Sequence, residues 1–177
     1  MPSSRKLILY IASSLDGYIA QNENDLSFLS LVEKEGEDYG YKSFIESVDT
    51  VIMGRKTYDW VTAQVAYPHS ELRSYIITRT PRPAIGNIQF YSGNLPDLIA
   101  RLKAEEGKNI FCDGGAEIAN ELSALNLIDE YIISVIPVLL GSGIRLFKDG
   151  RPMQTLTLIS AKTYDTGLTQ LHYSRTL

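Results

Sequence analysis

The feature that most constrains the fold is an alternation of short apolar runs with helical patterns along the chain. Apolar runs that are bounded by polar residues are typical of buried strands, particularly where β-branched residues are frequent. Helical patterns separate most of these runs, which favours an α/β domain with a largely parallel sheet. The runs expected to be strands are Lys6–Ala12, Asp49–Met53, Ser74–Thr78, Ile88–Tyr91, Asn109–Cys112 and Glu130–Leu140.

The expected helices show apolar residues at a spacing of three and four, which places them on one face. Asn94 stands where the helix with the stripe Leu95–Leu102 needs an N-cap, and Pro96 falls in the first turn of that helix. A further helix is predicted to begin just after Gly54 and to run through Trp60. The apolar stripes are Tyr41, Phe44, Ile45 and Val48; Leu95, Leu98, Ile99 and Leu102; and Ile118, Leu122 and Leu125.

The C-terminal region predicts an antiparallel hairpin, because Thr155–Tyr164 and Leu168–Arg175 flank the turn-forming residues 165–167. Gln21–Gly40 is polar and poorly periodic, so we expect a long loop with at most a short helix. Loops of that length in compact domains are often functional. No repeat or linker divides the sequence, and residues 1–177 are predicted to form a single domain.

Composition and charge exclude several classes of protein. The chain has 177 residues, 44% of them hydrophobic, and a formal net charge of −4, so it lacks the field of a general nucleic-acid or anionic-membrane binder. The longest uncharged stretch, Tyr131–Ile144, is shorter than the ~20 residues of a membrane span. A single cysteine, Cys112, and the distant His69 and His172 cannot build the usual zinc site. We therefore expect a cytoplasmic protein without a metal, nucleic-acid or membrane partner.

Two strand-to-helix junctions have the composition of anion sites. At the first, Gly54 is followed by Arg55 and Lys56, which add full charges to the partial positive charge of a helix N-terminus. At the second, Asp113–Glu117 includes paired glycines that let the backbone approach a ligand closely. Two such sites suit a dinucleotide, although a capped helix start and a tight turn are the simpler interpretations.

The end of the Ser74–Thr78 strand carries Arg79 where many NAD-binding domains place an acid. With Arg55 and Lys56, this arginine could surround the additional phosphate of NADP, whereas a plain surface arginine is the alternative. Gly141–Leu146 begins like a dinucleotide fingerprint, but Leu146 replaces its third glycine.

Three acids adjoin glycine-bearing loops and are candidate proton donors: Asp16, Asp38 and Asp113. Each could equally be a turn former. His69 and His172 lie in no recognisable catalytic pattern, and we expect them to be structural or exposed.

Four segments in order along the chain, residues 14–20, 48–58, 113–117 and 137–143, resemble the dihydrofolate reductase-like superfamily. The resemblance is to the group that shares the reductase domain of bifunctional riboflavin biosynthesis proteins. It implies a three-layer α/β sandwich with a mixed, mostly parallel central sheet, and NADPH as the hydride donor.

The resemblance also implies a role for each matching residue. Ala12 and Ile19 would offer backbone groups to the nicotinamide amide, and Thr78 with Arg79 would hold the adenosine-side phosphate. The other phosphate contacts would come from Gly54, Arg55, Lys56 and Thr57, and the diphosphate turn from Gly114, Gly115, Ala116, Glu117 and Ile118.

Some residues depart from the riboflavin-pathway pattern. Tyr18 stands where those reductases commonly have a basic residue, and residues 54–57 look more like folate reductases. A gapless count back from Gly54 brings the folate enzymes' acid to Asp38, but their usual Pro-Trp pair is missing from this chain.

The predicted function is an NADPH-dependent reductase of a small carbonyl or imine compound, with a heterocycle among the candidates. The alternatives are dihydrofolate reduction, a non-catalytic NADPH-binding protein, and nucleotide binding without redox chemistry. Relatives in this group often form dimers, and the apolar strand Tyr131–Leu140 is a candidate partner surface.

Overall fold

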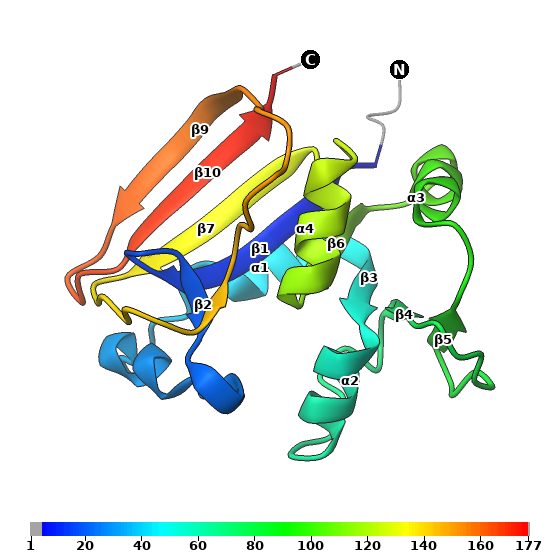
Figure 1. Ribbon diagram of the computed structural model, residues 1–177, viewed down its shortest axis with the longest axis horizontal. Helices are drawn as coiled ribbons and strands as arrows, with labels where there is room; N and C mark the ends of the chain where they lie inside the picture. The colour runs from blue at the N-terminus through cyan, green and yellow to red at the C-terminus, as the bar shows by residue number, and fades with distance from the viewer. Residues whose placement is uncertain (1–4, 177) are drawn as a thin grey trace.

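The computed structural model describes residues 5–176 and shows one large mixed sheet flanked by helices (Figure 1). Within that range the strand order is β5-β4-β3-β6-β1-β7-β10-β9. The strands β1 and β3 to β7 run parallel, β10 runs antiparallel to β7, and β9 antiparallel to β10. The bounds are β1 Leu7–Ser14, β3 Val48–Gly54, β4 Arg73–Ile77, β5 Ile88–Tyr91, β6 Asn109–Gly114, β7 Glu130–Ile136, β9 Leu156–Thr163 and β10 Thr169–Arg175. The predicted mixed α/β fold with a C-terminal antiparallel pair is confirmed.

Helices cover both faces of the sheet and make three layers. Successive residues of a strand point to opposite faces, so Ile52 packs against α3 and α4, whereas Val51 packs against α1. Figure 1 shows α4 in front of the sheet and α1 behind it. The bounds are α1 Tyr41–Glu46, α2 Arg55–Thr62, α3 Leu95–Ala104 and α4 Ala116–Ala124, with short 3₁₀ helices η1 Asn22–Asn24 and η2 Ser27–Val32. Among residues 5–176, no helix has the length and apolar composition to cross a membrane.

Helix α3 forms as its sequence predicts. The Asn94 side chain accepts a hydrogen bond from the backbone N–H of Asp97 at 3.0 Å, which satisfies one of the free donors of the first turn. The apolar stripe Leu98, Ile99 and Leu102 is almost completely buried against the sheet. Burial of each such side chain contributes about 1.5–3 kcal/mol, so packing, more than intrinsic propensity, stabilises this helix.

The structure differs from the expected pattern in the region of β7. This strand ends at Ile136 and not at Leu140, because Pro137 has no N–H to continue the ladder. Two further strands, β2 Tyr18–Ala20 and β8 Ile144–Arg145, pair with each other in a separate small sheet. They are too short to give a periodic signal in the sequence.

The suggested partner surface on Tyr131–Leu140 stays a prediction, with Leu139 as its exposed large apolar residue. Strand β7 lies between β1 and β10, and its Tyr131, Ile132 and Ile136 side chains are buried within the chain. The outer strand on this side of the sheet is β9, whose exposed apolar residues are Leu156, Leu158 and Ile159.

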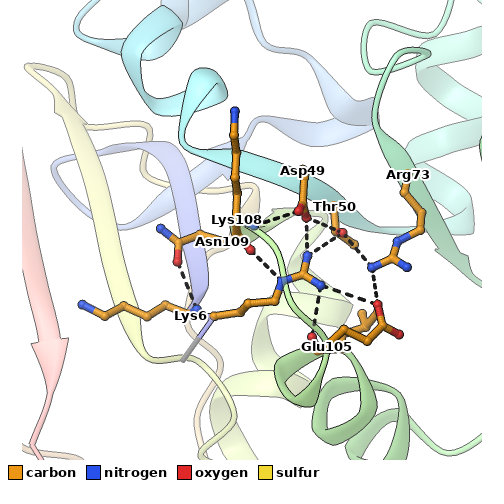
Figure 2. A network of polar contacts seen from close by, with 9 residues as sticks. Lys6, Asp49, Thr50, Arg73, Glu105, Lys108 and Asn109 are labelled. Atoms are coloured by element: carbon orange, nitrogen blue, oxygen red, sulfur yellow. Dashed lines mark hydrogen bonds and ion pairs between the residues drawn. The ribbon is translucent and has the colours of Figure 1, made fainter. Parts of the chain in front are cut away.

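A buried arginine joins the strand starts at the amino edge of the parallel strands. Arg5 pairs with Asp49 and donates to the Thr50 hydroxyl at 2.8 Å and to the carbonyl oxygen of Lys108 at 2.6 Å. Glu105 completes the cluster at 3.6 Å from the Arg5 guanidinium. Figure 2 shows the labelled partners of this network converging from different elements. The network therefore ties β1, β3 and the α3–β6 connection together.

We expect Arg5→Met to destabilise the fold by about 2–4 kcal/mol, because it leaves the buried Thr50 hydroxyl and Leu102 carbonyl and the half-buried carboxylates without their partner. Urea unfolding monitored by circular dichroism measures the change. Arg151→Met, at an exposed site, is the control and should shift stability by less than about 0.5 kcal/mol. A loss below about 1 kcal/mol for Arg5→Met would contradict a structural role for the network.

Candidate cofactor cleft and active site

The principal cleft lies at the carboxyl edge of the parallel strands and has a volume of about 1530 Å³. Strands β4, β3, β6 and β1 all end at this edge, so the loops that follow them come together there. The lining includes residues 54–57, 77–80, 92–96 and 115–118, together with Ala12 and Ile19. The structure thus gathers every predicted cofactor residue except Gly114, which is buried just before Gly115.

Two helix N-termini meet in the cleft. Helix α2 begins after Gly54 and α4 after Gly115, and neither glycine N-cap supplies a capping side chain. The unpaired N–H groups of both first turns are therefore available to an anion. The backbone N–H of Gly115 donates to the Thr57 hydroxyl at 2.9 Å, which joins the two turns.

The glycines at these turns are required by close packing and by backbone geometry. A Cβ atom on Gly115 would lie 2.7 Å from the Thr57 hydroxyl oxygen, and one on Gly54 would lie 3.0 Å from Ile118 Cγ1. Gly114 has φ +95°, a conformation that L side chains rarely adopt, and the Gly114–Gly115 peptide is cis. No larger residue fits these turns without displacing a neighbour.

Cations face the cleft from α2 and from the turn after β4. Arg55 pairs with Asp59 at 2.8 Å, Lys56 pairs with Glu117 at 3.0 Å, and Arg79 is exposed just beyond β4. The hydrogen bond from Lys56 holds the pKa of Glu117 below its usual range, so that side chain is a carboxylate. A bound phosphate would compete with Asp59 and Glu117 for these two cations.

An acid–histidine pair borders the cleft where β6 ends. Asp113 Oδ2 lies 2.8 Å from His69 Nε2, and His69 is buried against the rings of Tyr67 and Phe111. The Asp113 side chain retains 28% exposure and lines the cleft. An acid that faces a cleft and is hydrogen-bonded to a buried histidine has the arrangement of a general acid–base pair.

Two tyrosines near Asp113 remain neutral hydroxyl groups at physiological pH. Burial raises the pKa of Tyr41 to about 12 and that of Tyr67 to about 12, and the Asp113 charge adds to both shifts.

Sequence reasoning missed the pairing of Asp113 with His69, because His69 lies in an irregular connection between α2 and β4. Its distance from Asp113 is set only by the parallel pairing of β3 with β4 and β6.

The other two candidate acids serve the loops around them. Asp16 accepts hydrogen bonds from the Ser14 hydroxyl at 2.6 Å and from the backbone of Gly141 at 2.8 Å, which lower its pKa to about 2. Asp38 accepts from the backbone N–H groups of Gly40 and Lys42 at 2.9 and 3.0 Å, and these bonds lower its pKa. Both carboxylates are engaged by their own loops, and neither of them lines the principal cleft.

Within residues 5–176, no three acidic, histidine or cysteine side chains gather in a metal-binding group. Fold and cleft together define an α/β protein that presents two uncapped helix N-termini and the cations Arg55, Lys56, Arg79 and Lys148 to an anionic ligand. The RibD C-terminal domain family matches residues 5–170, and the chain belongs to that family.

Comparison with known proteins supports this membership over nearly the full length. The uncharacterized protein YwjB of Bacillus subtilis (strain 168) is 42% identical over 97% of this chain and 98% of its own. Among solved structures, a protein of Shewanella sp. PV-4 named provisionally as a riboflavin biosynthesis protein has a TM-score of 0.87 and 31% identity, over 97% of this chain and 99% of that one.

A more distant structure shares the fold alone. It is the Thermotoga maritima diaminohydroxyphosphoribosylaminopyrimidine deaminase/5-amino-6-(5-phosphoribosylamino)uracil reductase, with a TM-score of 0.74 and 12% identity. The match covers 98% of this chain but 57% of that one. The fold of this chain is thus that of a RibD-type reductase domain.

Proposed function

We propose that this protein is an NADPH-dependent reductase of a small heterocyclic carbonyl or imine compound. The observation that carries the proposal is the meeting of two uncapped helix N-termini with Arg55, Lys56 and Arg79 in one cleft. Membership of a reductase-domain family supports oxidoreductase chemistry. The free donors suit a diphosphate, and the cations suit further phosphate groups.

The residues of the cleft fit such a cofactor. The turns at Gly54 and Gly115 would hold the diphosphate, Arg79 the adenosine-side phosphate, and the Ala12 and Ile19 backbones the nicotinamide amide. When bound, NADPH supplies a hydride, which together with a proton reduces a C=O or C=N bond. Asp113, which is hydrogen-bonded to His69 and lines the cleft, would hold the proton. The walls of the cleft align the two reactants and exclude water.

We expect NADPH to bind at least tenfold more tightly than NADH. One charge-assisted hydrogen bond from Arg79 to the additional phosphate would contribute about 1.5–3 kcal/mol, which corresponds to tenfold or more. No acid stands at Thr78–Thr80, where it would repel that phosphate. Isothermal titration calorimetry with both cofactors measures the ratio.

Arg79→Gln should bring the two affinities within about threefold of each other, because the amide carries no charge. Arg101→Gln is the matched control: this arginine is exposed on α3 and does not line the cleft. Equal affinities of the native protein for NADPH and NADH would refute the proposed specificity.

Turnover separates the proposed enzyme from a protein that only binds the cofactor. NADPH oxidation is followed with dihydrofolate, ribosylaminopyrimidines, quinones and flavins as acceptors. The Thermotoga protein's name makes a phosphoribosylaminouracil one acceptor to include. Cofactor binding without oxidation by any acceptor in the screen would favour a binding protein, and strong competition by ATP would favour a nucleotide site.

A further inference from the structure

A second hollow, of about 570 Å³, opens beside the cofactor cleft. The two share Tyr10, Ala12, Leu29 and Tyr41 in their walls, so they form one continuous site. The strand order shows how far the hollow lies from Arg79 along the sheet. The hollow reaches past β1 to Ser134 and Ile136 on β7, whereas Arg79 follows β4. Four strand spacings, about 19 Å, separate β4 from β7.

The walls of the hollow suit a flat ring. Tyr10 and Tyr41 have ring centroids 5.7 Å apart in an edge-to-face arrangement, and the residue Tyr41 is 40% exposed. The Tyr10 hydroxyl donates to the Tyr39 carbonyl oxygen and accepts from Gln170, each at 3.2 Å, which fixes its orientation. Aromatic faces of this kind stack on planar heterocycles.

The charge of the hollow is opposite to that of the cofactor end. Its lining includes the carboxylates Glu33, Glu35, Glu37 and Asp38. Lys34 is the one cationic side chain in this lining, and it is ion-paired with Asp165, which lies outside the hollow. Within residues 5–176, Glu33 and Glu35 form no ion pair. The other cations of the continuous site, Arg55, Lys56, Arg79 and Lys148, line the cofactor cleft.

A phosphate group needs N–H donors or a guanidinium to replace its water, and a site that offers carboxylates repels it. We therefore infer that the hollow binds the hydride acceptor, and that this acceptor is a planar heteroaromatic compound with no phosphate and no net negative charge. The inference rests on the proposed reductase function and adds the substrate class. It sets this chain apart from reductases that act on phosphoribosyl compounds.

The test compares riboflavin with its 5′-phosphate, which present the same ring and differ only in the phosphate. Quenching of flavin fluorescence is titrated against the protein loaded with NADP⁺, at an ionic strength of about 0.01 M, where charges act over about 30 Å. We expect riboflavin to bind at least tenfold more tightly than its phosphate. The preference for riboflavin should become smaller at about 0.15 M salt, because charges then interact over only about 8 Å.

Charge reversal in the hollow tests the cause. The double variant Glu33→Lys/Glu35→Lys should reduce the preference for riboflavin to threefold or less. Glu71→Lys is the matched control, because Glu71 is exposed and lines neither cavity, and it should leave the preference unchanged. Equal or tighter binding of the phosphate, a preference that survives the double variant, or binding of neither flavin would overturn the inference.

Repeating the flavin titration without NADP⁺ separates this inference from the proposed function. Absence of NADP⁺ binding with the flavin preference intact would refute the NADPH-dependent reductase and leave the hollow as a site for uncharged rings. NADP⁺ binding with a preference for the phosphorylated flavin would refute the substrate class and leave the reductase standing.

Discussion

Gly115→Val is expected to weaken NADPH binding by at least about 100-fold while the protein stays folded. The new side chain would meet the Thr57 hydroxyl, 2.7 Å from the position of its Cβ, and would cover the free donors that begin α4. Loss of two backbone hydrogen bonds to phosphate, at about 1.5 kcal/mol each, corresponds to about 100-fold. Calorimetric titration measures the loss, and circular dichroism confirms the fold.

A double variant distinguishes the two effects of the valine. Thr57→Ala removes the hydroxyl that the new side chain would strike, so it relieves the internal clash without reopening the turn. NADPH affinity should therefore remain low in Gly115→Val/Thr57→Ala. Full recovery would show that Thr57 alone transmits the effect, and normal binding by Gly115→Val would place the diphosphate elsewhere.

Asp113→Asn is expected to lower turnover by about 100-fold or more with little change in NADPH affinity. General acid help contributes 10²–10⁴ in rate, and Asp113 is the cleft-facing acid that is hydrogen-bonded to His69. A general acid acts only in its protonated form, so the wild-type rate should fall with rising pH. The variant should lose that dependence. Steady-state NADPH oxidation across a pH series, with the acceptor identified by screening, provides the measurement.

Asp38→Asn tests the rival acid. Because backbone hydrogen bonds hold the pKa of Asp38 below its usual range, its carboxyl carries no proton to donate at neutral pH. We expect kcat to change by less than about threefold and the pH profile to be retained. Asp149→Asn, at an exposed turn outside both cavities, controls for the substitution itself. Loss of turnover and of pH dependence in Asp38→Asn, with Asp113→Asn unaffected, would reverse the assignment.

Much of the architecture could be predicted because its signals are local. The stripe Leu98, Ile99 and Leu102 and the N-cap Asn94 predict α3 from a few adjacent residues, and the structure shows each in that role. Gly54 and Gly115 likewise mark strand-to-helix turns, since a helix N-terminus with a glycine cap can be read from neighbouring positions.

Other features depend on residues far apart in the sequence. The short strands β2 and β8 form only because residues 18–20 pair with residues 144–145, and no sequence periodicity predicts this pairing. The apolar composition of β7 suggests an outer surface, but β10 pairs with β7 and places it inside the sheet. A local sequence pattern does not show which distant strands pair with each other.

Patterns of adjacent residues predict the layered α/β fold, the two glycine turns and the cations that follow Gly54. Contacts between distant residues determine which of the three candidate acids borders the cleft. Asp16, Asp38 and Asp113 look alike as loop residues next to glycine. Backbone donors from nearby turns hold the first two in their own loops, whereas the parallel pairing of β3 with β4 and β6 brings His69 to Asp113 beside the cleft. The partner of a carboxyl depends on its neighbours in space, and the tertiary fold determines those neighbours.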